Sequence, residues 1–530
     1  MSSGSGNGRL YLLKKGRNGL LHSIFSRLGL VLLLLLLQIG LLIAGFNWFA
    51  GYLPHVFGGQ TLLLLVMLLY LVNCQMDVNA KITWLVIIAL APVGGTLLLL
   101  FTRADAGHRA LRRRLDYIHR VSRHELPQDP AVSAKLEQSS PEVYGLSRYL
   151  WQTGDYPVYW HSQTRYYTSG QENFAAMLNA LEKARQFIFL EYFIINEGQM
   201  WGQILDILAR KAKAGVEVRV LYDGTNEFYR LPADYPRRLA ALDIKCQVFA
   251  PLQPLVSTHY NYRDHRKIVV VDGEVAFTGG FNLADEYINK VVRYGYWKDT
   301  GIMVRGEAVQ SFTLMFLQMW HLPERPGSSS AAGSLQQYIC TSPASYPDSG
   351  FIIPYGDCPL DDYEAGKRVY LHLLNQAKTY VHIMTPYLIL DEEMENALKY
   401  AAARGVEVIL ILPGIPDKII PYALAKTHYK SLLTAGVRIY EYAPGFVHAK
   451  VMVSDSCKAV VGTINFDYRS LYHHFECAAL LFNDPAVEQA ETDFIASRGE
   501  CREVTLANRL DKSRGLLVLG YVMKVLAPLL

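Results

Sequence analysis

Apolar residues are distributed unevenly along this chain. Residues 28–76 contain no Asp, Glu, Lys or Arg, and three apolar stretches occupy residues 28–50, 56–74 and 84–101. A helix needs about 20 mainly apolar residues to cross a bilayer. The pattern therefore predicts a membrane region over residues 28–102, with one transmembrane helix in each stretch.

The pattern changes after the apolar region. Short β-branched runs now alternate with segments of helical periodicity, which is typical of α/β domains. These runs occupy residues 187–195, 216–222, 267–271, 381–384, 406–412 and 450–453. A Gly- and Ser-rich segment at residues 326–334 predicts a linker. We therefore expect one α/β unit over residues 144–325 and another over residues 335–530.

Three segments of the first unit recur in the same order in the second. The matching pairs are residues 184–192 with 377–387, 213–218 with 403–408, and 265–272 with 448–455. An ordered set of matches at nearly constant offset indicates duplication. We expect two similar large α/β units rather than a solenoid of short repeats.

The last of these pairs carries a polar signature, H-x-K-x-x-x-x-D, followed by a glycine and then an asparagine. The signature residues are His265, Lys267 and Asp272 with Asn282, and His448, Lys450 and Asp455 with Asn465. Residues i and i+2 of a strand share a face, so each His is expected beside its Lys. A single copy is equally consistent with a core strand that ends in a tight turn. Two copies at identical spacing favour a catalytic function.

These side chains suit the chemistry of a phosphodiester. The anion repels nucleophiles, so a site needs fixed positive charge, a nucleophile and an acid for the leaving alkoxide. Paired His, Lys and Asn side chains supply all three, and we expect neither a cofactor nor a metal. The seven cysteines are scattered without a C-x-x-C motif, which gives no support for a zinc site or a disulfide framework.

From about residue 144 to its end, the chain resembles the phospholipase D superfamily, and within it the bacterial cardiolipin synthases. The resemblance rests on residues 191–194, 261–267, 278–282, 285–287, 296–299, 445–450, 462–470 and 526–530. His474 stands where the family usually has Asn, and Lys298 where Arg is common. The implied fold is two duplicated phospholipase D-like α/β sandwich units that share one active site, preceded by N-terminal transmembrane helices.

The resemblance also implies a reaction. A phosphatidyl group passes from one phosphatidylglycerol to another, giving cardiolipin and glycerol. His265 is expected to attack phosphorus and form a phosphohistidine, while His448 protonates the leaving alcohol and later deprotonates the acceptor. Spacing alone does not distinguish these two roles.

The remaining candidate side chains would support those two histidines. Lys267, Lys450, Asn282 and Asn465 would bind phosphoryl oxygens. By family position, Asp299 is expected to orient His265, and Glu476 to orient His448. Asp272 and Asp455 belong to the signature, although their positions suit the strand turn better than contact with substrate.

Three other activities fit parts of the sequence. A phospholipase D would use water as acceptor, and a cardiolipin synthase of a second kind would take phosphatidylethanolamine as donor. A nuclease is disfavoured because the net charge is only +4 and no long basic groove is evident. An inactive scaffold is disfavoured because both signatures are intact. We expect membrane lipids as partners and no nucleic acid; the oligomeric state is not readable.

Basic residues flank the apolar region on both sides, in residues 1–27 and in the connecting residues 103–143. Such flanks favour the cytoplasm, which predicts a multi-pass protein of the cell membrane with its α/β units inside. Two cytoplasmic flanks require an even number of crossings. Three candidate helices are odd in number, so we give the seven arginines after Phe101 more weight than the five basic residues before Leu28. We then expect residues 56–74 and 84–101 to form a hairpin, and residues 28–50 to cross with an outside N-terminus or to dip back without crossing.

Overall fold

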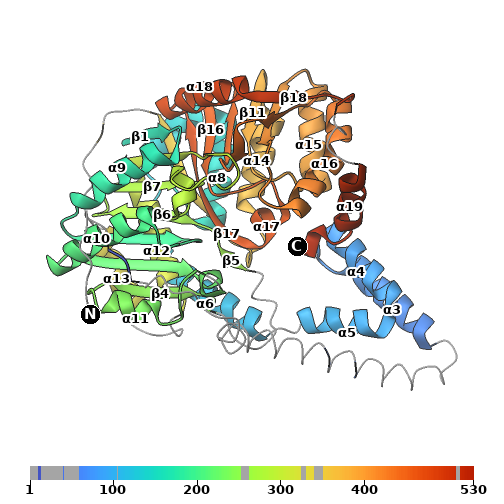
Figure 1. The fold of residues 1–530 in the computed structure, drawn as a ribbon, viewed down its shortest axis with the longest axis horizontal. Helices are drawn as coiled ribbons and strands as arrows, with labels where there is room; N and C mark the ends of the chain where they lie inside the picture. Colours follow the sequence, from blue (N-terminus) through green and yellow to red (C-terminus); the bar gives the residue numbers. More distant parts are fainter. Residues whose placement is uncertain are drawn as a thin grey trace. The chain divides into compact units, whose positions relative to one another are not determined.

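The computed structural model describes residues 10–12, 40, 44, 59–103, 106–123, 125–228, 230–251, 262–323, 330–339, 346, 350–508 and 514–529. The chain divides into two compact units, and Figure 1 labels their elements. The large unit comprises Met1–Leu13, Arg113–Pro251 and Tyr262–Gly520. The small unit comprises Lys14–Arg112, Leu252–Asn261 and Tyr521–Leu530.

The first half of the large unit is built on a seven-stranded sheet of order β1-β9-β7-β6-β2-β3-β4. Its strands are β1 (Ser162–Tyr167), β2 (Phe187–Tyr192), β3 (Glu217–Asp223), β4 (Lys245–Phe249), β6 (Lys267–Val271), β7 (Val275–Gly279) and β9 (Gly301–Gly306). β2, β3 and β4 are parallel, and the other pairs are antiparallel. The intervening helices are α9 (Gly170–Glu182), α10 (Gln199–Lys213) and α11 (Tyr235–Ala240).

The second half repeats this topology, in the order β10-β17-β16-β15-β11-β12-β13-β18. Its strands are β10 (Phe351–Asp357), β11 (Tyr380–Met384), β12 (Glu407–Pro413), β13 (Arg438–Tyr442), β15 (Val451–Ser454), β16 (Lys458–Gly462), β17 (His474–Phe482) and β18 (Cys501–Val504). β11, β12 and β13 are parallel, as their counterparts are. Helices α14 (Ala365–Gln376), α15 (Glu392–Ala403) and α16 (Ile419–Thr434) connect them. The predicted duplication of an α/β unit is thus confirmed.

The two halves are joined reciprocally. Helix α12 (Val309–His321) follows β9 and packs against β10, while α18 (Pro485–Gly499) follows β17 and packs against β1. All but one of the α12 side chains are buried on every side of the helix, because α12 lies between the two halves. Two short parallel pairings also cross between the halves: β5 (Arg263–Asp264) with β17, and β14 (Gly445–Val447) with β8 (Tyr296–Lys298).

The start of the first half differs from the prediction. The expected boundary at residue 144 lies inside α8 (Pro141–Gly154), which follows α7 (Pro130–Ser139). Apolar side chains of both helices, Val132, Leu136 and Leu150 among them, belong to the core of the second half. Their amphipathic faces need a partner to bury them, and they find it on α14 and β10.

The linker prediction is also corrected in part. Helix α13 (Ser330–Ile339) begins inside the predicted linker at residues 326–334, and residues 326–329 lie outside the described residues. The Ala and Ser residues of this stretch have moderate to good helix propensity, which the Gly- and Ser-rich composition obscured. The remaining short elements are α6 (Ala106–Ser122), α17 (Tyr468–Tyr472), α19 (Arg514–Lys524), η2 (Gly224–Phe228), η4 (Asp285–Ile288) and η5 (Ala527–Leu529).

The small unit contains three apolar helices, α3 (Gly59–Asn73), α4 (Val78–Leu90) and α5 (Pro92–Arg103). The continuous helix expected over residues 84–101 is wrong, because the chain breaks at Ala91 before Pro92, which cannot continue the backbone hydrogen bonding. The helix expected over residues 28–50 lies outside the described residues apart from Gly40 and Ala44. Among the helices that the structure describes, none is both long and apolar enough to cross a membrane.

Candidate active site

A cavity of about 610 Å³ lies in the large unit and is lined by both halves. The signature residues His265 and His448 both line it, together with Asn282 and Asn465. The other lining residues are Phe193, Ile194, Thr225, Asn226, Arg230, Glu286, Tyr287, Arg293, Tyr294, Trp297, Tyr387, Asp417, Lys418, Asp467, Arg469 and His474. One cavity shared by the two signatures is what the sequence predicted.

Backbone pairing between the halves places each imidazole. Asp264 of β5 pairs with Phe475 of β17, and the next amide, that of His265, donates to the Phe475 carbonyl at 2.9 Å. In the other half, Val447 of β14 pairs with Lys298 of β8, and the His448 amide donates to the Lys298 carbonyl at 2.7 Å. The strand pairs therefore place His265 next to Glu476, which follows Phe475, and His448 next to Asp299, which follows Lys298.

The carboxylate pairing predicted from sequence is therefore wrong. His265 Nδ1 lies 2.8 Å from Glu476 Oε1, and His448 Nδ1 lies 2.7 Å from Asp299 Oδ2. Each imidazole is held by a carboxylate of the opposite half, because β5 and β14 pair across the junction rather than within their own sheets. An Nδ1–H that donates to a carboxylate leaves Nε2 as the nitrogen available for chemistry.

Both signature lysines are almost completely buried beside their histidines. Lys267 Nζ donates to the His265 carbonyl at 2.5 Å, and Lys450 Nζ donates to the His448 carbonyl. Lys450 Nζ also lies 3.0 Å from His448 Nδ1. Burial lowers the pKa of Lys267 to about 8 and that of Lys450 to about 7.

The same environment keeps the imidazoles neutral. Burial, followed by the positive charges of Lys267 and Lys450, lowers the pKa values of His265 and His448 well below the usual range. Burial also raises the pKa of Asp299 to about 7. A neutral imidazole retains the lone pair that nucleophilic attack on phosphorus needs.

The two asparagines are placed differently. Asn282 Oδ1 accepts from the Ile194 amide at 3.0 Å, and its Nδ2 donates to the Tyr287 hydroxyl at 2.8 Å. Asn465 is buried, and its Oδ1 has no hydrogen-bond partner among the residues that the structure describes. Asn465 therefore lines the cavity from the second half, whereas Asn282 also fixes the cavity wall.

Asp272 and Asp455 do not line the cavity. Asp272 accepts from the amides of Arg185, Gln186 and Phe187 at 2.7–2.8 Å, and its φ is +53°. Asp455, with the same φ, accepts from the amides of Lys378, Thr379 and Tyr380 at 2.8–3.1 Å. Grouping them with the catalytic side chains is therefore corrected: each carboxylate fastens the turn after its signature strand to the start of β2 or β11.

Comparisons with known proteins agree with this geometry. The family sequence model described as "Cardiolipin synthase, PLD-like domain" matches residues 177–320 and 370–497. A cardiolipin synthase of Alkalihalophilus pseudofirmus is 32% identical over 91% of this chain and 95% of its own. A cardiolipin synthase of Halalkalibacterium halodurans is 31% identical over 95% of this chain and 100% of its own. The chain belongs to the cardiolipin synthase family. It is therefore a phosphatidyltransferase.

Two further matches extend the comparison. An uncharacterized protein of Streptococcus mutans is 50% identical over 87% of this chain and 99% of its own. The crystal structure of a phosphatidylserine synthase of Haemophilus influenzae matches with a TM-score of 0.56 at 16% identity, covering 73% of this chain and 100% of that one. The structural match supports the duplicated phospholipase D-like fold of the family.

Sequence reasoning missed most of the cavity wall. Aromatic rings of Phe193, Tyr287 and Trp297 lie 5.0–5.4 Å from the His265 or His448 rings. Four cationic side chains also line the cavity, namely Arg230, Arg293, Lys418 and Arg469. Arg230 and Lys418 come soon after β3 and β12. Because ligands bind beyond the carboxyl ends of parallel strands, this position in the sequence could have identified both residues as candidates for the cavity wall.

The two departures from the family pattern have different placements. Lys298 is buried away from the cavity lining, with Nζ 2.6 Å from Asp493 Oδ1 of α18, so it joins the halves. His474 lines the cavity, and its ring lies 5.2 Å from that of His265. Neither His474 ring nitrogen has a hydrogen-bond partner in the described part of the chain. Burial lowers the pKa of His474 to about 3.

One group of side chains in the described ranges has spacing that would suit a metal ion: His265, His474 and Glu476, with ligand atoms within 4.8 Å of one another. In this structure His265 Nδ1 is already engaged by Glu476. The closeness of His265 and Glu476 is thus explained by the hydrogen bond that orients His265.

Proposed function

We propose that this protein is a membrane-bound cardiolipin synthase that transfers a phosphatidyl group from one phosphatidylglycerol to another and releases glycerol. The observation that carries the proposal is the crossed arrangement of two His–carboxylate pairs around one cavity. Such an arrangement gives one imidazole on each side of a phosphate, as displacement in line requires. The cationic wall suits the anionic headgroup of the donor.

In the first step, Nε2 of neutral His265 attacks phosphorus. The Nε2–P bond forms as the bond from phosphorus to the glycerol oxygen breaks, and His448 donates its proton to the departing alkoxide. This requires a protonated His448 when donor is bound. The negative charges of the phosphodiester and of Asp299 raise the pKa of His448 when donor binds, and this offsets the lowering of that pKa by burial in the empty site.

In the second step, His448, now neutral, accepts the proton of a glycerol hydroxyl on a second phosphatidylglycerol. That oxygen attacks phosphorus, the Nε2–P bond breaks, and His265 returns to its starting state. Lys267, Lys450 and Asn465 bind the non-bridging oxygens, whose charge is greatest in the two transition states. Water in place of the second lipid would give phosphatidic acid.

The membrane assignment has separate support. The small unit exposes many aliphatic side chains on α3, α4 and α5. Five of them are 52–82% exposed, namely Leu65, Leu69, Val72, Ile82 and Leu90. Exposed apolar area on this scale needs an apolar partner. We assign that partner as the lipid bilayer, with the large unit on the cytoplasmic side.

The test uses purified full-length protein and phosphatidylglycerol labelled in its headgroup. We expect cardiolipin and free glycerol in equal amounts. Phosphatidic acid as main product would indicate a phospholipase D instead, and a cardiolipin yield that rises with unlabelled phosphatidylethanolamine would indicate a different donor. Activity is expected to persist in EDTA.

A trapping experiment tests the role of each histidine. With phosphatidylglycerol, His448→Ala should be slowed at the first step, because it lacks the acid for the leaving alkoxide. With a phosphatidyl ester of p-nitrophenol, whose leaving group needs no proton, His448→Ala should still form the phosphohistidine but fail to activate the acceptor, so phosphatidyl label is expected to accumulate on the protein. The His265→Ala variant should carry none. Label found on His448 in His265→Ala would reverse the two roles.

A further inference from the structure

Five exposed aliphatic side chains of the large unit gather in two short segments. Val291 and Val292 are 49% and 77% exposed, in the segment 289–295 between η4 and β8. Ile415, Ile419 and Ile420 are 40%, 64% and 40% exposed, in the segment 414–420 that follows β12. We call these five residues the apolar rim. Scattered exposed aliphatics are ordinary, but a contiguous set marks a binding surface.

Both segments belong to the mouth of the active-site cavity. Arg293 and Tyr294 line the cavity from the first segment, and Asp417 and Lys418 line it from the second. Each half of the molecule thus supplies one segment. The five residues of the apolar rim lie on the same segments but are not among the residues that line the cavity.

The two segments are fixed next to each other. The Tyr296 amide donates to the Pro444 carbonyl at 3.0 Å, and the Ile415 amide donates to the Gly445 carbonyl at 3.2 Å. A Cβ added at Gly295, whose φ is +70°, would lie 3.2 Å from Ile415 Cδ1. The end of the first segment therefore lies directly against Ile415 of the second.

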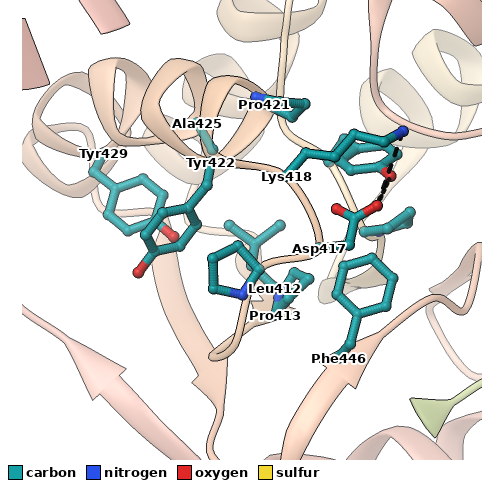
Figure 2. Close-up of a pocket in the computed structure, with 12 residues that line it drawn as sticks. Leu412, Pro413, Asp417, Lys418, Pro421, Tyr422, Ala425, Tyr429 and Phe446 are labelled. Carbon is teal, nitrogen blue, oxygen red and sulfur yellow. Dashed lines mark hydrogen bonds and ion pairs between the residues drawn. The ribbon is translucent and has the colours of Figure 1, made fainter. Parts of the chain in front are cut away.

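The second segment is also stiff. Pro413, Pro416 and Pro421 restrict its backbone, and they line a narrow groove with Leu412, Tyr422 and Phe446. Figure 2 shows Asp417 and Lys418 beside this groove, and Asp417 Oδ2 accepts from the Tyr387 hydroxyl at 2.8 Å. Such a segment presents its isoleucines in a set position, with no ordering cost when they meet a partner.

Basic side chains accompany the rim. Lys290, Arg293 and Lys418 are exposed, and the side chains of Arg293 and Lys418 retain 53% and 67% of their surface. The acidic neighbours are turned inward, since Glu286, which binds Arg293 at 3.0 Å, is 8% exposed and Asp417 is 15% exposed. Apolar tips flanked by exposed cations match a surface that is apolar inside and anionic at its face.

We propose that the apolar rim inserts into an anionic bilayer and holds the cavity mouth at the level of the headgroups. The inference deepens the proposed function and rests on it. A donor whose acyl chains stay in the bilayer delivers its phosphate to the two histidines only if the mouth lies at headgroup depth. The rim and its cations supply that depth, independently of the apolar helices of the small unit.

The test compares two forms of the same substrate. Full-length protein is reconstituted in vesicles of phosphatidylcholine with phosphatidylglycerol, and a water-soluble, short-chain phosphatidylglycerol is supplied in a parallel assay. In the Val292→Ser/Ile419→Ser variant we expect turnover of bilayer substrate to fall about tenfold or more, while turnover of the short-chain substrate stays at the wild-type level. The matched control is Ile495→Ser on α18, which is 49% exposed and does not line the cavity; it should match wild type in both assays.

A second readout measures depth directly. Measured as the difference from wild type, which has seven tryptophans of its own, the fluorescence added by Val292→Trp should be quenched by brominated lipid in the same vesicles, and that added by Ile495→Trp should not. An unquenched Val292→Trp, or equal loss on both substrate forms, overturns the proposal. Loss of activity in cells without quenching would assign the rim to a protein partner and overturn it as well. If wild type makes no cardiolipin from either form of the substrate while Val292→Trp is quenched, the proposed function fails and the membrane contact stands.

Discussion

Asp299 and Glu476 differ by one methylene, and the residues that face them differ to match. Gly280 leaves no room beside Asp299, since a Cβ there would lie 2.0 Å from Asp299 Oδ1 and 2.8 Å from the His448 carbonyl. At the equivalent place in the second half stands Thr463, whose hydroxyl donates to Glu476. The two His–carboxylate pairs are therefore built differently, in line with the two different roles that we propose for His265 and His448.

This asymmetry predicts unequal effects of two small substitutions. Gly280→Ala should displace Asp299 from His448 and lower kcat by about 100-fold, whereas Thr463→Val removes one hydrogen bond to Glu476 and should lower it by about tenfold. Steady-state kinetics on short-chain phosphatidylglycerol measures both. Gly145→Ala, where an added Cβ meets nothing within 4 Å, is the control. Wild-type activity in Gly280→Ala would contradict the assigned role of Asp299.

The pKa values of the buried groups predict a narrow pH profile. Above about pH 7 to 8, Lys450 and then Lys267 lose their protons in the free enzyme, so the cavity loses positive charge and phosphate binding weakens. Below about pH 7, Asp299 gains a proton and no longer supports a charged His448. We expect kcat/KM to be bell-shaped around neutrality. The profile of kcat should be broader on the alkaline side, because bound phosphate keeps the lysines charged; a flat kcat/KM between about pH 6 and pH 9 would contradict this.

At the scale of elements, the sequence predicts the repeated α/β unit but not the short strand pairs that join the two halves. The buried runs of β2 and β11 and the repeated signatures were enough to predict two similar sheets. The strand pairs β5–β17 and β8–β14 were not predictable, because segments of two and three residues carry no periodicity. They decide which carboxylate meets which histidine, so the pairing of Asp299 and Glu476 was assigned to the wrong partners while the residues themselves were found.

The signature aspartates act at the same scale. Asp272 satisfies three amides at the start of β2, so Asp272→Ala should leave buried donors unpaired and lower the free energy of unfolding by roughly 2 kcal/mol or more. Folded Asp272→Ala should keep a kcat close to that of wild type. Chemical denaturation and kinetics on the same preparation measure the two quantities. Asp272→Asn, which tolerates the positive φ and keeps one acceptor oxygen, should be less destabilised. A stable but inactive Asp272→Ala would give the carboxylate a direct catalytic role.

At the scale of the whole molecule, charge and apolar content predict which part of the chain meets the membrane, but not where its helices begin and end. The apolar stretches were found from the sequence, but the break before Pro92 divides the third into α4 and α5. Trp84 and Ile88 of α4 pack with Leu99 of α5 and with Met67 and Leu71 of α3. Helices α4 and α5 therefore fold back on each other across the break in a hairpin-like cluster with α3. Hydropathy alone predicts that the whole stretch is apolar, but not where a helix within it ends.

The basic flanks predict the orientation of the large unit. Residues 103–123 hold seven arginines directly after the apolar region, which is a stronger cytoplasmic signal than the basic residues before residue 28. We therefore predict that protease added to intact, right-side-out cells leaves the chain beyond Arg103 uncut, and that it is degraded once the membrane is opened. A thiol-reactive, impermeant label gives an independent measurement, because a cysteine introduced at exposed Ile495 should react only after permeabilisation. Labelling at that position in sealed cells would place the large unit outside, and the phosphatidylglycerol of the proposed reaction would then have to come from the outer leaflet.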